Sequence, residues 1–422
     1  MFRPFAERHP VVFGRVAARS EAFAPTCASG GAPVVIGCAA GSSAEAVIPR
    51  ARGELTERVS NILAGRAAES EGRVMTTFAE LRRAGAAALD PAAWPELEAA
   101  TELRQARMLW VTGTSLISHD EVLVPASAVF LRHRPPPGCA LMLRAGSAGV
   151  SAHLSWKTAV CHALLEVLER DLISGSWYGT DGDALALRRP ALSPLLGQAL
   201  DELGLQPTVL VLPGPDASTA SRPNSPAPAG GPANAVCVVV CLHTAERRQQ
   251  SFGARGVLVA SDVSLFGGAE VAAYEALMVR WSMGTPVARR AWQDMQGSSL
   301  LTLPRGALEH ALWTFHRQDS LGRWLAKAAA AKERTAMVDG WTAPETTKPD
   351  ATVDERRLAR LLAEHTGQDV VVVDTPAPKV CADGLTVVRV VASGARRLPS
   401  DERTVPLSHG TDRHNPLPHP FG

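Results

Sequence analysis

Residues 163–171 read Ala-Leu-Leu-Glu-Val-Leu-Glu-Arg-Asp and contain the pattern E-x-x-E-R at Glu166, Glu169 and Arg170. The surrounding residues 155–173 place apolar side chains at the spacing of one buried helix face, so we predict a helix there. Residues three and four apart share a helix face, and the pattern therefore puts two carboxylates and a guanidinium side by side. On an isolated helix, such a cluster is more often an ordinary solvated face.

The same pattern occurs a second time, at Glu54, Glu57 and Arg58, inside the predicted helix of residues 42–63. Repetition favours a functional interpretation over a solvated face. If the two helices face each other, their four glutamates can bind a divalent metal and their two arginines a phosphate group. A magnesium-nucleotide site needs this set when a glycine-rich phosphate loop is absent, and the sequence has no such loop.

Composition narrows the class of protein. The chain has 422 residues, 46% of them hydrophobic, and a formal net charge of +1. Its scattered charge argues against nucleic acid or an anionic membrane as the main partner. Because no run of about 18 apolar residues exists and charges interrupt the amino terminus, we expect neither a membrane span nor a signal peptide, and we expect a cytoplasmic protein. The seven cysteines never form C-x-x-C, which argues against structural disulfides and zinc.

Predicted strands and helices follow one another without a regular β-α alternation, which favours an α+β fold over a doubly wound sheet. Strands are predicted at residues 11–13, 34–36, 108–112, 122–124, 208–212, 236–242, 370–373 and 386–391, and helices at 42–63, 155–173, 269–281, 306–331 and 355–365. Pro49 either kinks or restarts the first helix. Residues 214–234, dense in Pro, Gly, Ser and Ala, are predicted to be a flexible insertion. Residues 406–422 are a proline-rich tail, and its last residues, 415–422, are predicted to be extended because of their alternating prolines.

Together these segments resemble the YcaO family, and the resemblance runs across nearly the whole chain. The family's central signature is similar to residues 147–149, Ser-Ala-Gly, followed by residues 163–171, and its earlier motif is similar to residues 53–58. Shorter matches lie at residues 110–116, 124–126, 374–375 and 384–390. The resemblance implies a single YcaO-like catalytic domain over residues 1–422, with mixed sheets and helices around a nucleotide cleft.

The activity that the resemblance implies is an ATP-dependent cyclodehydratase acting on a ribosomally made precursor peptide. A Cys, Ser or Thr side chain attacks the preceding backbone carbonyl, ATP phosphorylates the oxyanion, and loss of phosphate gives a thiazoline or oxazoline. Such enzymes use ATP and Mg2+. The site residues carried over by position are the magnesium ligands Glu54, Glu57, Glu166 and Glu169, the phosphate contacts Arg58 and Arg170, Ser147 near the nucleotide, and the alternating prolines Pro416, Pro418 and Pro420, which organise the active site in azoline-forming members.

The resemblance also implies partners. No segment resembles the ThiF-like leader-binding module that is fused to some relatives, so we expect a separate ThiF-like protein to capture the precursor peptide. A flavin-dependent azoline dehydrogenase is a further partner in such pathways. The sequence leaves the oligomeric state open, and a homodimer is compatible with it.

Four positions depart from the family pattern. Arg50 stands where a serine is usual, and His153 stands where a glycine is expected. On the helix around Glu275, Val279 and Ser282 are interpreted as replacing a glutamate and a glutamine. These departures leave open a degenerate, non-catalytic scaffold that partners a catalytic paralogue. Another alternative keeps ATP activation but forms a thioamide or amidine, and the proline ending argues weakly against it.

Overall fold

The computed structural model describes most of the chain. The described residues are 1–5, 9, 11–24, 33–97, 100–179, 185–187, 192–214, 234–259, 262–297, 303–317, 319–330, 354–378, 380–381, 384–404 and 417–421. Of the predicted insertion 214–234, residues 215–233 lie outside the described residues, and so does Pro416 of the tail.

Three antiparallel sheets form the framework. The two-stranded sheet pairs β1 (Val12–Arg19) with β2 (Val34–Gly41). The four-stranded sheet has the order β10-β9-β8-β7, with β7 (Leu185–Leu187), β8 (Gln206–Pro213), β9 (Asn234–His243) and β10 (Ser251–Val259). The six-stranded sheet has the order β3-β4-β11-β12-β6 with β5 beside β4, and consists of β3 (Val74–Thr76), β4 (Met108–Ser115), β5 (Glu121–Pro125), β6 (Val150–His153), β11 (Val370–Asp374) and β12 (Thr386–Ala392).

Helices fill the space between the sheets and cover their outer faces. They are α1 (Ala44–Glu71), α2 (Phe78–Arg83), α3 (Ala126–Val129), α4 (Trp156–Tyr178), α5 (Pro194–Glu202), α6 (Asp262–Met283), α7 (Pro286–Gly297), α8 (Ala307–Arg317), α9 (Ser320–Ala330) and α10 (Glu355–Thr366). Antiparallel sheets with helices interspersed confirm the predicted α+β class. Among the described helices, none combines the length and apolar content that a membrane span requires.

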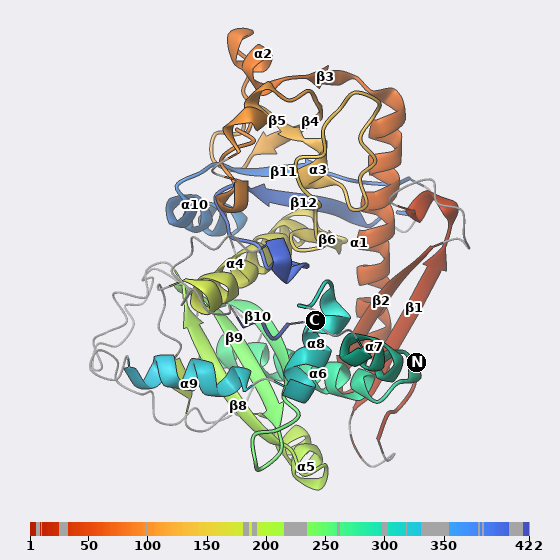
Figure 1. The fold of residues 1–422 in the computed structure, drawn as a ribbon, viewed down its shortest axis with the longest axis vertical. Helices are drawn as coiled ribbons and strands as arrows, with labels where there is room; N and C mark the ends of the chain where they lie inside the picture. The colour runs from red at the N-terminus through yellow and green to blue at the C-terminus, as the bar shows by residue number, and fades with distance from the viewer. Residues whose placement is uncertain are drawn as a thin grey trace.

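Helix α4 is the centre of the molecule because it lies between the six-stranded and the four-stranded sheets (Figure 1). Its buried side chain Leu164 shares one core with Val388 and Val390 of β12 and with Val239 and Phe252 of the other sheet. The outer face of the four-stranded sheet is covered by α5 and α6. The polar residues of α4 are therefore held at the junction of two sheets.

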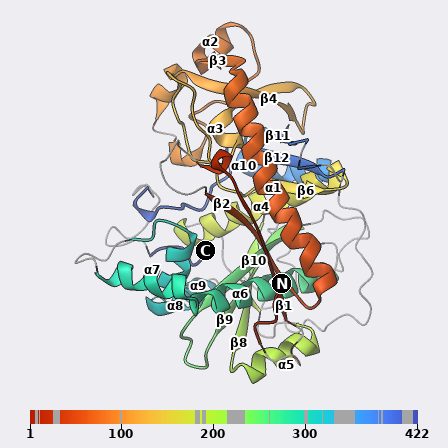
Figure 2. The same ribbon diagram turned by 90° about the vertical axis from the view of Figure 1, so that its right-hand side faces the viewer.

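Helix α1 runs along the side of the molecule and contacts both β2 and β6 (Figure 2). It begins after Ser43, whose hydroxyl oxygen accepts a hydrogen bond from the N–H of Ala46 at 3.3 Å. It ends at Gly72, whose φ of 55° suits glycine. Pro49 lies inside this helix, which is continuous, so the alternative of a restart at Pro49 is wrong.

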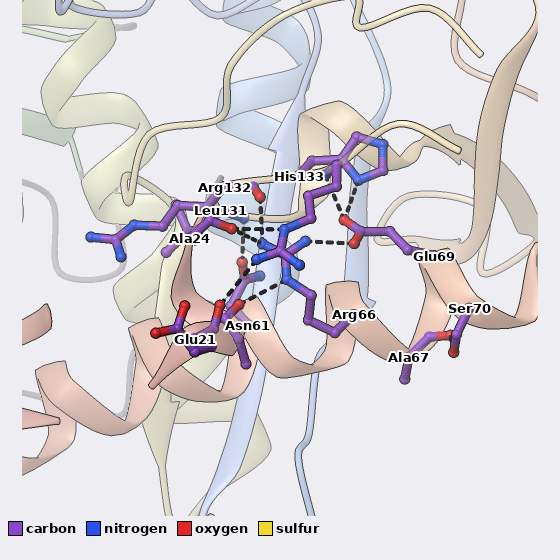
Figure 3. A network of polar contacts seen from close by, with 12 residues as sticks. Glu21, Ala24, Asn61, Arg66, Ala67, Glu69, Ser70, Leu131, Arg132 and His133 are labelled. Carbon is purple, nitrogen blue, oxygen red and sulfur yellow. Dashed lines mark hydrogen bonds and ion pairs between the residues drawn. The ribbon is translucent and has the colours of Figure 1, made fainter. Parts of the chain in front are cut away.

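A polar network fixes the second half of α1 (Figure 3). Glu69 accepts hydrogen bonds from His133 at 2.8 Å and from Arg66 at 2.5 Å. Arg66 also donates to the carbonyl oxygens of Ala24 and Arg132, at 3.1 Å and 2.6 Å. These charge-assisted bonds connect α1 to two loops and hold its first half, with Glu54 and Glu57, in a defined position.

Candidate functional site

The first glutamate of the earlier motif lies on α1 beside the free edge of β2. Glu54 Oε2 accepts a hydrogen bond from the backbone N–H of Cys38 at 2.5 Å. Its Oε1 forms an ion pair with Arg58 at 2.5 Å, and Arg58 donates to the carbonyl oxygen of Ile36 at 2.5 Å. Arg58 is thus engaged by its own helix and by β2.

Glu57 and Glu166 come from different helices and both reach the same edge strand. Glu57 Oε1 accepts a hydrogen bond from the N–H of Ala152 in β6 at 2.9 Å. Glu166 Oε2 of α4 accepts one from the N–H of Gly149, just before β6, at 3.0 Å. The two copies of E-x-x-E-R, which the sequence could place only on separate helices, are therefore brought face to face.

Two further carboxylates bind the free edge of β10. Glu169 Oε2 of α4 accepts a hydrogen bond from the N–H of Gly256 at 2.9 Å. Glu275 Oε2 of α6 accepts one from the N–H of Ala254 at 3.1 Å. Arg170 lies beside Glu169, with 3.5 Å between Nη2 and Oε1. Glu275 is a member of the site that the sequence analysis did not assign.

One arrangement unites the five glutamates: each uses one carboxylate oxygen to accept an N–H from backbone at the free edge of β2, β6 or β10. Edge strands normally leave such N–H groups unpaired, and a carboxylate makes a strong, charge-assisted bond to them. Glu57, Glu166 and Glu275 have no second hydrogen-bond partner among the described residues. Their other oxygens are therefore available to a ligand.

The acids raise one another's proton affinity. Burial, and then the charges of Glu166 and Glu54, raises the pKa of Glu57 to about 8. Burial and the charge of Glu169 raise the pKa of Glu275 to about 7. The pKa of Glu166 is also raised, chiefly by burial. This excess of buried negative charge favours a bound cation.

Arg170 is the cation at the centre of the cluster. Burial acts to lower its pKa, but the charges of Glu169, Glu166 and Glu275 outweigh that effect and raise it. The guanidinium group is therefore held between the acids of α4 and α6, where its N–H groups can bind a phosphate beside a metal.

The chain is similar to a known protein family and to several solved structures. Residues 35–214 match the family model described as YcaO cyclodehydratase, ATP- and Mg2+-binding. The solved structure of YcaO from Methanopyrus kandleri, bound with AMPPCP and Mg2+, is similar over 95% of this chain and 87% of that chain, with a TM-score of 0.53 and 20% identity. Residues 35–214 thus match the YcaO family model, and the chain shares the fold of a YcaO protein.

Other solved structures share this fold. A chain of the Escherichia coli microcin synthetase McbBCD complex is similar over 92% of this chain and 91% of that chain, with a TM-score of 0.56 and 14% identity. A heterocyclase in complex with substrate and cofactor matches 86% of this chain with a TM-score of 0.53 and 16% identity, but this chain covers only 45% of it. A curated relative from Methanothermobacter thermautotrophicus is 36% identical over 75 residues, which are 18% of this chain and 19% of that protein.

Ser147 lies in the turn that leads to β6. Its carbonyl oxygen accepts a hydrogen bond from the N–H of Val150 at 3.0 Å. Arg389 of β12 is buried and donates to the neighbouring carbonyl of Gly146 at 2.7 Å. Its charge also acts on Glu166. Arg389 thus fixes the turn that presents the Gly149 N–H to Glu166.

Val279 and Ser282 of α6, interpreted as replacements, lie away from the acidic cluster. Val279 packs against the cluster of Met283 and Ala288, and the Ser282 hydroxyl donates to the carbonyl of Val279 at 2.6 Å. Neither contacts the acids, whereas Glu275 does. Glu275 is therefore the residue of α6 that joins the acidic cluster.

Asp171, which ends the central motif, lies outside the acidic cluster. It is buried and accepts hydrogen bonds from Arg396 N at 2.8 Å and from His365 Nε2 at 2.6 Å. These contacts tie α4 to α10 and to the loop after β12, so Asp171 supports the site without facing it.

The tail returns to the end of α4. Pro418 and Pro420 are buried, and the carbonyl of Leu417 accepts a hydrogen bond from Trp177 Nε1 at 2.8 Å. Further on, Phe421 packs against Phe252, with 5.9 Å between ring centroids. The predicted proline-rich tail thus lies against the helix that carries Glu166 and Glu169.

Buried Glu402 anchors this tail. Its Oε1 accepts hydrogen bonds from Tyr178 Oη at 2.5 Å, from the His419 N–H at 2.9 Å and from His310 Nε2 at 3.0 Å. Its Oε2 is buried without a partner among the described residues. One carboxylate oxygen thus links the segment Leu417–Phe421 to α8 and to the end of α4.

His310, Glu402 and His419 are close enough together to be considered as metal ligands. The two imidazole rings are stacked, with centroids 4.0 Å apart and planes at 12°. Ring nitrogens bind metals along lone pairs in the ring plane, and two parallel stacked rings cannot aim those lone pairs at one ion. Since all four ring nitrogens also have protein partners, the cluster is a hydrogen-bonded anchor.

Proposed function

We propose that this YcaO protein is an ATP-dependent cyclodehydratase that converts Cys, Ser or Thr residues of a ribosomally made precursor peptide to thiazolines or oxazolines. The observation that carries the proposal is the convergence of five glutamates from α1, α4 and α6, each anchored through one oxygen. The fold shared with a YcaO protein bound to AMPPCP and Mg2+ supports it.

The residues present fit magnesium. Mg2+ prefers carboxylate oxygens and keeps part of its coordination shell for water and phosphate. Glu57, Glu166 and Glu275 offer free oxygens in a region whose raised pKa values signal uncompensated negative charge. Glu54 and Glu169 complete the set from the two motifs. When bound, the metal would neutralise charge on the nucleotide phosphates.

The chemistry explains why ATP is needed. The amide oxygen is a poor leaving group, so the reaction converts it to a phosphate, which departs when the five-membered ring closes. The side chains of this chain would position the reactants: Arg170 and Arg58 would bind phosphate oxygens, and Ser147 would lie beside the nucleotide. Fixed charges of this kind stabilise phosphoryl transfer without needing to reorganise.

The tail would complete the site on the peptide side. Pro418 and Pro420 are buried against the end of α4, and the anchor at Glu402 fixes their position. Pro416, outside the described residues, belongs to the same proline series. We assign these prolines an organising role, because proline restricts the backbone and thus preorganises a peptide-binding surface.

A separate ThiF-like protein would deliver the leader of the precursor peptide, and a flavin-dependent dehydrogenase would oxidise the azoline. Mixing the pure protein and a precursor peptide without the leader-binding partner should give little product. Robust turnover by the two alone would argue against the partner.

A second candidate function is a non-catalytic scaffold for a catalytic paralogue. Arg50, Val279 and Ser282 favour it, because all three positions depart from the family pattern. A scaffold would still support product formation by its partner after substitution of the acids, whereas an enzyme would lose activity.

Calorimetric titration of magnesium-ATP tests the first function. The Glu166→Gln, Glu169→Gln double variant keeps an amide oxygen for each backbone N–H but removes both charges. A Glu71→Gln, Glu364→Gln variant, altered at two exposed residues, is the matched control. We expect binding by the wild type and the control and none by the site variant, with all three folded.

The absence of binding by the folded wild type in the presence of its partner would identify the scaffold. Binding that survives in the double variant would place the nucleotide elsewhere in the protein.

A further inference from the structure

A pocket of about 260 Å³ lies where the start of α4 meets the start of α10 and the end of β4. Leu116, Trp156 and Val372 contribute apolar side chains to it, and Lys157, Glu355 and Arg356 contribute charged ones. None of its lining residues belongs to the acidic cluster or to the tail anchor.

The pocket also opens on a different side of α4 from the acids. Lys157, which lines it, and Glu166 are nine residues apart. At 3.6 residues per turn, this separation is about two and a half turns, so the two side chains leave the helix in opposite directions. A ligand in the pocket therefore leaves the acidic cluster uncovered.

Hydrogen bonds hold the walls of the pocket in place. The indole Nε1 of Trp156 donates to Asp374 Oδ1 at 3.0 Å. The hydroxyl of buried Ser115 donates to Asp369 Oδ1 at 2.8 Å and accepts the N–H of Ile117 at 3.1 Å, which fixes the loop after β4. Because the pocket is preformed, a ligand does not have to order it on binding.

Apolar surface is exposed around the pocket. The side chain of Trp156 remains 37% exposed, and the same two segments expose Ile117 at 41% and Leu154 at 71%. Exposed apolar side chains that gather at a hollow mark interaction sites. Since an apolar cavity of about 150 Å³ holds benzene, this pocket has room for one aromatic side chain. It is smaller than the sites of about 300–1,000 Å³ that take whole small molecules.

The rim of the pocket carries cations that are available to a ligand. Arg356 is exposed, and its side chain forms neither a hydrogen bond nor an ion pair among the described residues. Lys157 has a 73% exposed side chain, with 3.5 Å between its Nζ and Oε1 of the buried Glu355. Two exposed cations therefore stand against one buried carboxylate that already has a partner. This balance favours an anionic group beside the apolar hollow.

We propose that this pocket docks a short segment of another polypeptide, which places one aromatic side chain in the pocket and an adjacent acidic side chain beside Arg356 and Lys157. An aromatic ring buried in a preformed pocket is the usual anchor of a protein interface. Charges on the rim add specificity and speed up association. The docking site is separate from the nucleotide site and does not depend on it.

A phage-displayed library of random peptides tests the docking site. The library is selected on the immobilised wild type and counter-selected on Thr114→Phe. Thr114 lines the pocket and is exposed on β4, so a phenylalanine there fills the hollow. Thr112→Phe is the matched control, because Thr112 is exposed on the same face of the same strand and does not line the pocket. Melting curves verify that both variants are folded.

We expect the selected peptides to share Trp, Tyr or Phe next to Asp or Glu. A synthetic peptide with this motif should bind the wild type and Thr112→Phe alike, and Thr114→Phe about tenfold or more weakly. Arg356→Gln should weaken binding about two- to fivefold, since the pair is exposed. Arg360→Gln, at an exposed position on the same helix, should change nothing.

A double-mutant cycle tests the charge contact itself. Replacing the acid of the peptide with its amide should cost as much as Arg356→Gln, and the two changes together should cost little more than either one. Additive losses would refute the contact with Arg356.

Selected peptides without a common aromatic residue would overturn the proposal. So would a motif peptide that binds the folded Thr114→Phe as tightly as the wild type. Trp156→Ala removes one wall instead of filling the space and gives a second test. Undiminished binding to this variant, with the protein folded, would likewise exclude the pocket as the docking site.

Discussion

The N–H of Gly149 donates a hydrogen bond to Glu166 Oε2 at 3.0 Å, although the two residues lie 17 positions apart. Gly149 has a φ of +84°, which other residues rarely adopt. A Cβ atom added there would lie 2.8 Å from the carbonyl oxygen of Val390. The glycine therefore allows the turn before β6 to approach α4 and to orient a carboxylate of the site.

Replacing Gly149 with alanine should disturb this carboxylate. The added Cβ atom meets backbone that cannot move aside easily, so we expect a loss of unfolding free energy of about 1–3 kcal/mol. Magnesium-ATP binding should weaken at the same time, because Glu166 loses its orienting donor. Gly146→Ala is the control, since nothing lies within 4 Å of its added Cβ atom. Equal behaviour of the two variants in calorimetry and melting experiments would contradict this role.

Magnesium binding should strengthen as the pH rises from about 6 to 9. Without metal, Glu57 and Glu275 have pKa values of about 8 and about 7, so both are largely protonated below neutral pH. Carboxylates must lose their protons before they bind a metal, and binding therefore releases protons. Calorimetry in two buffers of different ionisation enthalpy measures the number of protons released on binding. In Glu57→Gln the count should fall, and an unchanged count would exclude Glu57 as a ligand.

The same acids should make the metal-free protein less stable at alkaline pH. The pKa of Glu57 is raised from 4.5 in the unfolded chain to about 8 in the folded protein. Between these values the folded state binds more protons, so its stability falls as the pH rises. The melting temperature of Glu57→Gln should therefore rise relative to that of the wild type as the pH increases from 5 to 8.5. A constant difference over this range would show that the Glu57 carboxyl is not perturbed.

Local spacing predicted much of the site but not its assembly. The i, i+3 spacing of Glu166 and Glu169 placed both on one face of α4, as the structure has them. Glu275 has no such signal: it belongs to no E-x-x-E-R pattern, and only its hydrogen bond to β10 and the nearby charge of Glu169 reveal its place. Those contacts depend on long-range packing, which no local pattern encodes.

The tail shows the same limit. Alternating prolines predicted an extended conformation from residue 416 onward, because proline fixes its own backbone angle. Where this segment attaches depends on Glu402 and His310, which lie 17 and 109 positions before His419 and belong to separate elements. Their buried contacts appear only when α8 and the end of α4 are packed together.

Asp171 should matter for stability and little for nucleotide binding. Its buried carboxylate accepts hydrogen bonds from Arg396 and His365, so Asp171→Asn leaves buried donors without a charged acceptor. We expect a loss of about 3–5 kcal/mol in unfolding free energy. At a temperature where the variant is folded, its affinity for magnesium-ATP should stay close to that of the wild type. Asp201→Asn, at an exposed position, is the control, and an unchanged denaturation midpoint in Asp171→Asn would refute the prediction.

Glu402 should control the docking of the tail separately from nucleotide binding. In Glu402→Gln, the three donors on Oε1 lose a charged acceptor, and hydrogen bonds to charged groups contribute about 1.5–3 kcal/mol each. Hydrogen exchange at the His419 and Phe421 amides should therefore speed up, while magnesium-ATP affinity stays the same and product formation falls. Tyr178→Phe removes only one of the three donors and should show a smaller change in the same direction. If the tail amides remained equally protected in Glu402→Gln, the carboxylate would not be the anchor, and the burial of Pro418 and Phe421 alone would hold the tail in place.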